Sequence, residues 1–158
     1  MRTKKNYTRA VEPDAKHQSV LVNKLINRVM KQGKKTIAMK HVYSAIDTVT
    51  KKTKKKPQEL MEELVERISP KVEVRTRRVG GASYQVPVSV KPRRATSLAI
   101  RWLVTEAAKK PNDKYHTYGE KLAAEMMDAL NNEGGAIEKK NNAHRMAEAN
   151  KAFAHFKW

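Results

Sequence analysis

A short arginine-rich segment is the part of this sequence with the clearest capacity for chemistry. Between Lys71 and Arg94 there are seven basic side chains and a single acidic one, Glu73. An arginine guanidinium can grip a phosphate through two hydrogen bonds or stack on a base, and Tyr84 in the same segment can also stack. The segment therefore favours recognition of nucleic acid, although a solvated hairpin without a ligand has the same composition. The basic residues are Lys71, Arg75, Arg77, Arg78, Lys91, Arg93 and Arg94.

A β-hairpin is expected to carry these side chains. Residues 72–90 alternate with period two on both sides of Gly80-Gly81. A two-residue loop there would mix polar and apolar side chains on each face, whereas a loop of odd length centred on Gly81 gives one apolar face. We therefore expect a three- or five-residue tip, or an equivalent bulge. The expected pairs are Val72 with Val90, Val74 with Val88, Thr76 with Val86, and Arg78 with Tyr84.

Six helices are expected around the hairpin, which makes the fold mainly α. In each helix, apolar residues recur at steps of three and four, the period of a helix with one buried face. The first begins near His17 and stops at Gly33, and the third lies between Pro57 and Pro70. The second is expected to give way to a loop at the crowded lysines of residues 51–56. The fourth follows Pro92, the fifth stops at Gly134-Gly135, and the sixth starts near Ile137.

The charge balance points to a polyanionic partner. The chain has 34 Lys and Arg residues against 16 Asp and Glu, a formal net charge of +18. Nucleic acid relieves the resulting self-repulsion when lysine and arginine displace its condensed counterions. A membrane surface is the alternative, but the sequence has no long apolar run and no signal-peptide pattern. Because cysteine is absent, disulfides and zinc fingers are excluded. This absence implies no redox compartment, and we take the cytoplasm as the default expectation.

Residues 1–16 are expected to differ from the helical domain at residues 17–158. They have no helical or strand period and few apolar side chains. We expect a flexible basic arm that orders on RNA, or alternatively a disordered terminus without a role. The basic residues of this segment are Arg2, Lys4, Lys5, Arg9 and Lys16.

Patterns for catalysis or metal binding are weak. The five histidines are scattered, and none has a metal-binding spacing with a carboxylate, so no metal, cofactor or catalytic residue is expected. Gly33-Lys34-Lys35 lacks the upstream glycine and the following Ser or Thr of a nucleotide-binding loop. It is better explained as a helix end followed by two exposed lysines. Glu62, Glu63 and Glu66 are better explained as a solvated face than as a catalytic carboxylate pair.

Three stretches resemble a single protein family in order and spacing, over nearly the whole chain. The first is Gly33-Lys34-Lys35 with the following Val42-Tyr43-Ser44-Ala45, and the second is the hairpin from Val72 to Pro87. The third is His144-Arg-Met-Ala-Glu-Ala-Asn-Lys-Ala-Phe-Ala-His155. In these stretches the chain is similar to the family of the seventh protein of the small ribosomal subunit, in its bacterial form. The run from Lys51 to Lys56 departs from the more mixed loop of that family; we favour a solvated run over a further RNA contact.

The resemblance implies a function as well as a helical fold with a β-ribbon. It implies direct binding to the 3′ major domain of small-subunit rRNA, nucleation of head assembly, and a position near exit-site tRNA at the subunit interface. It also implies contact with the eleventh small-subunit protein, proximity to the ninth, and an ability to repress the mRNA of its own operon. The expected rRNA contacts are Arg2, Lys4, Lys5, Arg9, Lys34, Lys35, Arg75, Arg77, Arg78, Arg93, Arg94 and Arg145. The hairpin tip expected near tRNA is Val79, Gly80, Gly81, Ala82, Ser83 and Tyr84.

Two other functions remain open on the residues alone. A DNA-binding regulator would place the ribbon in a groove, which dimerisation and a preference for duplex DNA would favour. A ribonuclease would need a cluster centred on a metal or a histidine, which the sequence does not offer.

Overall fold

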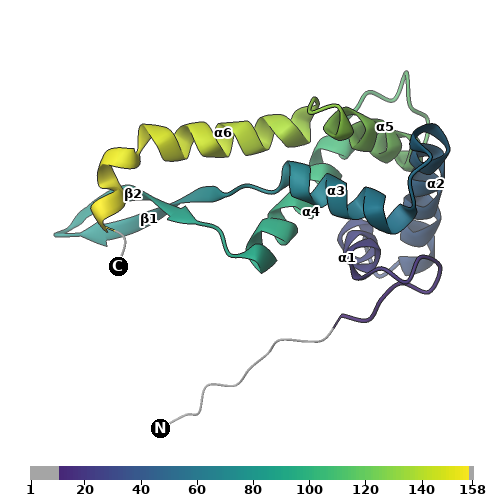
Figure 1. Cartoon of the computed structure of the whole chain (residues 1–158), viewed down its shortest axis with the longest axis horizontal. Helices are drawn as coiled ribbons and strands as arrows, with labels where there is room; N and C mark the ends of the chain where they lie inside the picture. Colours follow the sequence, from purple (N-terminus) through teal and green to yellow (C-terminus); the bar gives the residue numbers. More distant parts are fainter. Residues whose placement is uncertain (1–10, 157–158) are drawn as a thin grey trace, which may run out of the picture.

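Helices make up most of the structure, and a two-stranded ribbon extends from them (Figure 1). The structure is a computed structural model in which residues 11–156 are described. The expected mainly α fold with an inserted antiparallel ribbon is confirmed within these residues. The elements are α1 (Val20–Val29), α2 (Lys35–Thr53), α3 (Pro57–Ile68), β1 (Val72–Val79), β2 (Ala82–Ser89), α4 (Pro92–Lys109), α5 (Tyr118–Leu130), α6 (Gly135–Ala149) and the 3-10 helix η1 (Lys151–Phe156).

An apolar core joins the helices at the end of the molecule away from the ribbon tip (Figure 1). α5 packs against both α2 and α4, while α1 and α3 each contact α2 and α4. Burial of these apolar side chains is the main favourable term in folding, and it decides which faces of α1 and α4 remain outward. The largest contributions come from Val22, Leu25, Ile26, Val42, Ile46, Leu60, Leu64, Leu103, Leu122 and Met126.

Two helices end away from the positions expected from the sequence. α1 ends at Val29, so Gly33 lies in the turn that follows, with a φ of +73°. α2 does not stop before its lysines but continues through Lys51 and Lys52 to Thr53. Lysines in the last turn of a helix are stabilised by the negative end of its dipole, and this offsets their mutual repulsion.

The starts of α3 and α4 are those expected, whereas the passage from α5 to α6 is not. Pro57 and Pro92 each occupy a first helical turn, where no backbone hydrogen bond is lost. α5 already ends at Leu130, and Gly134 is the residue that precedes α6. Gly134 has a φ of +86°, and a Cβ there would lie 2.9 Å from the Cβ of Asp128. The tight turn into α6 therefore requires glycine at position 134, and this glycine does not serve to end α5.

A buried carboxylate holds the start of α6 against α4 and α5. The Glu125 side chain is 2% exposed and accepts a hydrogen bond from the backbone N–H of Ala136 at 2.8 Å. It also lies 3.2 Å from Nζ of Lys110, which donates to Asp128 at 2.6 Å. Desolvation lowers the pKa of Lys110, but the hydrogen bonds to Asp128 and Glu125 outweigh it and raise that pKa above its ordinary value. The end of α4, the C-terminal half of α5 and the start of α6 are thus tied together by the two ion pairs of Lys110 and by the hydrogen bond from Ala136 to Glu125.

The ribbon closes through a two-residue turn, so the expected odd-length tip is wrong. Val79 pairs with Ala82 across Gly80-Gly81, whose φ angles are +57° and +90°. Two positive φ values are what the tightest hairpin turn demands, and glycine adopts them without a steric cost. The expected pairs are all displaced by one residue: Val72 lies opposite Ser89, Val74 opposite Pro87, Thr76 opposite Gln85, and Arg78 opposite Ser83.

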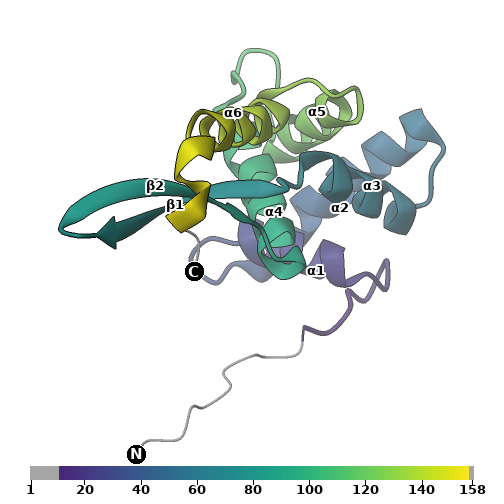
Figure 2. The same ribbon diagram turned by 60° about the vertical axis from the view of Figure 1, so that its left-hand side comes forward.

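The mixed faces of the ribbon are tolerated because its apolar cover comes from elsewhere in the chain. α6 packs against both strands, and η1 packs against β2 (Figure 2). The ring of Tyr84 lies 5.4 Å from that of Phe153 and 5.0 Å from that of Phe156, measured between centroids. Val86 is fully buried although its partner Arg75 is exposed. Val86 is therefore the one buried residue of the two strands, and it is covered from outside the ribbon rather than by its cross-strand partner.

Polar contacts from α6 fix the base of the ribbon. The backbone N–H of Lys71 donates to Nε2 of His144 at 3.0 Å. One turn earlier on α6, Nζ of Lys140 donates to the backbone carbonyl of Arg67 at 2.5 Å. Since an isolated two-stranded hairpin is barely stable in water, these contacts and the aromatic cover determine where the ribbon points.

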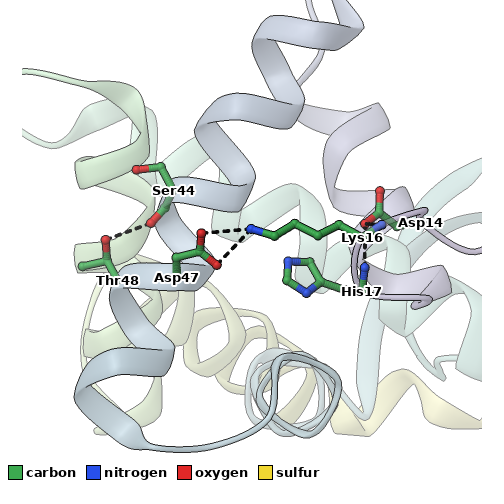
Figure 3. Close-up of polar contacts among 6 residues, drawn as sticks. All are labelled: Asp14, Lys16, His17, Ser44, Asp47 and Thr48. Atoms are coloured by element: carbon green, nitrogen blue, oxygen red, sulfur yellow. Dashed lines mark hydrogen bonds and ion pairs between the residues drawn. The ribbon is translucent and has the colours of Figure 1, made fainter.

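The residues that lead into α1 are bound to α2 (Figure 3). The buried Asp14 carboxylate accepts hydrogen bonds from the backbone N–H groups of Lys16 and His17, both at 3.2 Å, and from the Tyr43 hydroxyl at 2.7 Å. Burial, and then this hydrogen bond, raise the pKa of Tyr43 to about 12. Lys16 reaches Asp47 at 3.0 Å. That residues 1–16 form a flexible arm stays a prediction, because residues 1–10 lie outside the described residues.

We expect Glu125→Gln to lower the free energy of unfolding by about 2 kcal/mol, because the charge of Lys110 would then face a neutral amide in a buried position. Urea denaturation measures this change. Glu133→Gln, which alters an exposed glutamate in the nearby turn, is the matched control and should change stability by less than about 0.5 kcal/mol. Equal effects of the two substitutions would contradict the role given to Glu125.

Candidate nucleic-acid interface

A basic groove of about 590 Å³ runs between α1 and the start of α4. Its charged side chains are Lys24, Arg28 and Arg93, and no carboxylate lines it among the described residues. Asn27, Thr96 and Ser97 add hydrogen-bonding groups, and Val20 and Ile100 add apolar surface. A groove with one sign of charge and low-dielectric walls concentrates its field on an anion.

The amphipathic pattern of α1 explains two of these cations. Leu25 and Ile26 are buried in the core, which turns Lys24 and Arg28, four residues apart, toward the groove. Sequence reasoning missed both of them as candidate contacts. The four-residue spacing of Lys24 and Arg28 was visible in the sequence. Only the packing of α1 on α4 shows that these two side chains line the same groove as Arg93.

The first turn of α4 carries cations where a helix favours anions. It contains Arg93 and Arg94 and no acidic residue. The N-terminal end of a helix is itself positive, so these side chains do not help the helix but add to its attraction for a phosphate. The ribbon leads directly into this turn, which joins its basic surface to the groove.

Glu73 organises the arginines at the ribbon base. Its carboxylate contacts Arg75 at 2.5 Å and Arg94 at 3.3 Å. Desolvation by burial raises the pKa of Glu73, but hydrogen bonds from Arg75 and then Arg94 outweigh it and hold this pKa below its ordinary value. The two predicted arginines are therefore brought together, with part of their charge neutralised and their guanidinium groups held in place.

The other predicted residues are spread over several elements. Lys34 and Lys35 are exposed at the start of α2, Arg78 is exposed near the ribbon tip, and Arg145 is exposed on α6. Arg77 is half-buried on β1. The predicted arm contacts Arg2, Lys4, Lys5 and Arg9 lie outside the described residues.

The residues of the ribbon tip differ in their exposure to solvent. Val79 is half-buried, and Gly80, Gly81, Ala82 and Ser83 are exposed, whereas Tyr84 is packed on Phe153 and Phe156. A stacking role for Tyr84, which the sequence suggested, would require it to leave that aromatic contact.

Arg101 is a further residue to which the sequence drew little attention. It follows Ser97 of the groove by one turn of α4, and its Nε atom is buried without a hydrogen-bond partner in the described part of the chain. A buried donor without an acceptor costs free energy, so an acceptor brought by a bound molecule would be favourable here.

These features define a class of protein: a basic, mainly α nucleic-acid-binding protein with a β-ribbon. Among residues 11–156 there is no group of three or more metal-binding side chains. None of the described helices is long and apolar enough to cross a membrane.

Comparisons with known proteins agree with this class and narrow it. The family model described as "Ribosomal protein S7p/S5e" matches residues 1–151. Small ribosomal subunit protein uS7 of Dictyoglomus turgidum is 54% identical over 150 residues, which is 95% of this chain and 94% of that protein. The uS7 proteins of Thermosipho melanesiensis and Thermotoga neapolitana are 53% and 54% identical over 158 residues, the full length of both chains.

The chain belongs to the ribosomal protein S7 family. It is a structural constituent of the small ribosomal subunit in the cytoplasm and not an enzyme. The resemblance drawn from three sequence stretches is confirmed, and the alternatives of a DNA-binding regulator and a ribonuclease are set aside.

We expect the attachment of the ribbon base to weaken in acid. Burial, and then the charges of Lys140 and Lys71, lower the pKa of His144 below its ordinary value. Between about pH 6.5 and that lowered pKa the unfolded chain binds a proton that the folded one does not, so stability is full above this window and falls as pH drops through it. Protonation also removes the acceptor for the Lys71 N–H.

NMR titration checks this expectation. The His144 ring should titrate below pH 6.5, and the Lys71 amide should lose its protection from hydrogen exchange over the same range. The Val90 amide, which donates at 3.0 Å to the Lys71 carbonyl, is the internal control because its acceptor does not titrate there. A His144 pKa at or above 6.5 would contradict the expectation.

Proposed function

We propose that this protein binds the 3′ major domain of small-subunit rRNA directly and nucleates assembly of the subunit head. The observation that carries the proposal is the groove between α1 and α4, with Lys24, Arg28 and Arg93 and no carboxylate among its described lining. Phosphate contacts of this kind supply most of the affinity, while RNA shape and a few base contacts supply the specificity.

The proposed contact surface continues along the ribbon and the exposed lysines. It includes Arg75, Arg77, Arg78 and Arg94 at the ribbon, Lys34 and Lys35 at the start of α2, and Arg145 on α6. The basic residues Arg2, Lys4, Lys5 and Arg9 would extend it as a flexible arm. All of these sites are supported by their charge, and the described ones except the half-buried Arg77 are supported also by their exposure.

The finer placement in the subunit is part of the same proposal. The ribbon tip, Val79 to Tyr84, would lie near exit-site tRNA at the subunit interface. The neighbouring proteins would be the eleventh small-subunit protein, in contact, and the ninth, nearby. The surface that binds rRNA would also bind the mRNA of its own operon and repress its translation. The family membership and the projecting basic ribbon support this placement.

The test is the binding of the full chain to a 3′-major-domain rRNA fragment and to an equal-length RNA of scrambled sequence, across salt concentrations. We expect a preference for the rRNA fragment that persists as salt rises, because shape-dependent contacts are screened less than phosphate contacts. Equal binding to both RNAs, fading together with salt, would overturn the proposal.

A matched pair of lysine variants locates the interface. Lys24→Gln should weaken binding and reduce the slope of log affinity against log salt by roughly 0.7 to 0.9, the loss of one phosphate contact. Lys52→Gln removes the same charge from the end of α2, where we favour a solvated lysine run, and should leave the slope unchanged. Equal effects of the two variants would show a generic polycation instead of a defined groove.

A further inference from the structure

A second groove lies on the other side of Arg28. It has a volume of about 470 Å³ and is formed by the end of α1, the start of α2, α4 and the start of α5. Its rim holds Arg28, Lys31, Lys34 and Lys121, and no carboxylate lines it among the described residues. This volume is within the range of roughly 300 to 1,000 Å³ that is usual for pockets holding small organic groups.

The lining of this groove is apolar and aromatic, unlike a simple phosphate site. Ile37 and Val104 line it together with the rings of His41 and Tyr118. The two rings meet edge to face with centroids 6.0 Å apart, and the Tyr118 hydroxyl donates to the Val104 carbonyl at 3.4 Å. Burial raises the pKa of Tyr118 to about 12, so this donor keeps its proton near neutrality. The aromatic lining is therefore held in place before any ligand arrives.

Ile37 is the residue whose environment the fold alone does not explain. It is 51% exposed, although it lies in a groove whose rim is cationic. The position is on the first turn of α2, where a polar residue would serve the helix equally well. An exposed branched aliphatic side chain surrounded by cations suits a ligand that is flat and apolar on its face and anionic at its edge.

We propose that this second groove binds one unstacked nucleotide of the rRNA. Its base would lie against Ile37, His41 and Tyr118, and its flanking phosphates would contact Arg28, Lys31 and Lys34. Sequence-specific recognition of RNA commonly relies on bases that are splayed out of a helix and stacked on aromatic side chains. The inference rests on the proposed function, and it adds a base contact to a surface that otherwise offers mainly phosphate contacts.

Continuity with the first groove favours RNA over an acidic peptide as the occupant. Arg28 lines both grooves, and Arg101 lies on α4 between Ser97 of the first groove and Val104 of the second. The Nε of Arg101, which has no hydrogen-bond partner among the described residues, would donate to a phosphate bridging the two grooves. One strand could thus pass from the ribbon through the first groove and into the second without leaving cationic surface.

Binding of the full chain to the 3′-major-domain fragment at several salt concentrations tests the proposal. We expect Ile37→Ala to weaken binding by about three- to tenfold at every salt concentration without changing the salt slope, because an apolar contact with a base releases no counterion. Lys34→Gln should weaken binding and also reduce the slope by roughly 0.7 to 0.9. In base-specific chemical probing, one nucleotide protected by the original protein should become reactive with Ile37→Ala.

Met146→Ala is the matched control, since Met146 is 54% exposed on α6 and outside the groove. It should bind the fragment as the original protein does. If Ile37→Ala also binds unchanged while Lys24→Gln binds weakly, the nucleotide pocket is overturned and the proposed function stands. If Ile37→Ala binds rRNA normally but is poorly retained in subunits assembled with the other proteins, the groove holds a protein segment and the proposal fails. Loss of preference for the rRNA fragment by the original protein would overturn the proposed function itself.

Discussion

Mutual repulsion between cationic side chains is the constraint under which this protein folds. A formal net charge of +18 has to be held together by a core that is almost wholly apolar. Acidic residues are placed where cations meet one another or approach the core: Glu73 lies between Arg75 and Arg94, and Glu125 meets Lys110. On the surface, Asp47, Glu63 and Glu106 pair with further cations, and the positive charge in excess of these pairs lies on outward faces, where a polyanion would offset it. Folding and RNA binding are thus two consequences of one charge distribution.

The helical part of the fold could be predicted from the sequence because it depends on local periodicity. Leu25 and Ile26 mark the buried face of α1, and Pro57 and Pro92 mark helix starts, whatever the rest of the chain does. The ribbon register could not be predicted by the same reasoning. That reasoning assumed that the hairpin must form its own apolar face, whereas Phe153 and Phe156, far along the chain, supply the cover.

The candidate interface was predictable in its chemistry but not in its shape. The arginines of the ribbon and of α4 stand out in the sequence as a dense basic segment. Lys24 and Arg28 do not stand out, because a pair of cations on a helix surface is ordinary until another helix is placed beside it. Grooves arise from pairs of elements distant in sequence, such as α1 with α4, and no local pattern records that pairing.

The way the ribbon is held decides how its tip can act. Tyr84 is committed to the aromatic contact with η1, and His144 fixes the base through the Lys71 N–H. Beyond Tyr84, the exposed tip offers only two glycines, an alanine and a serine. Such a tip has little side-chain surface for stacking. A nucleic acid beside it would therefore contact the backbone groups of the tip and fit its shape. A rigid base with a small tip positions the ribbon as a spacer, which leaves the proposed base contact to the second groove, toward the C-terminal end of α4.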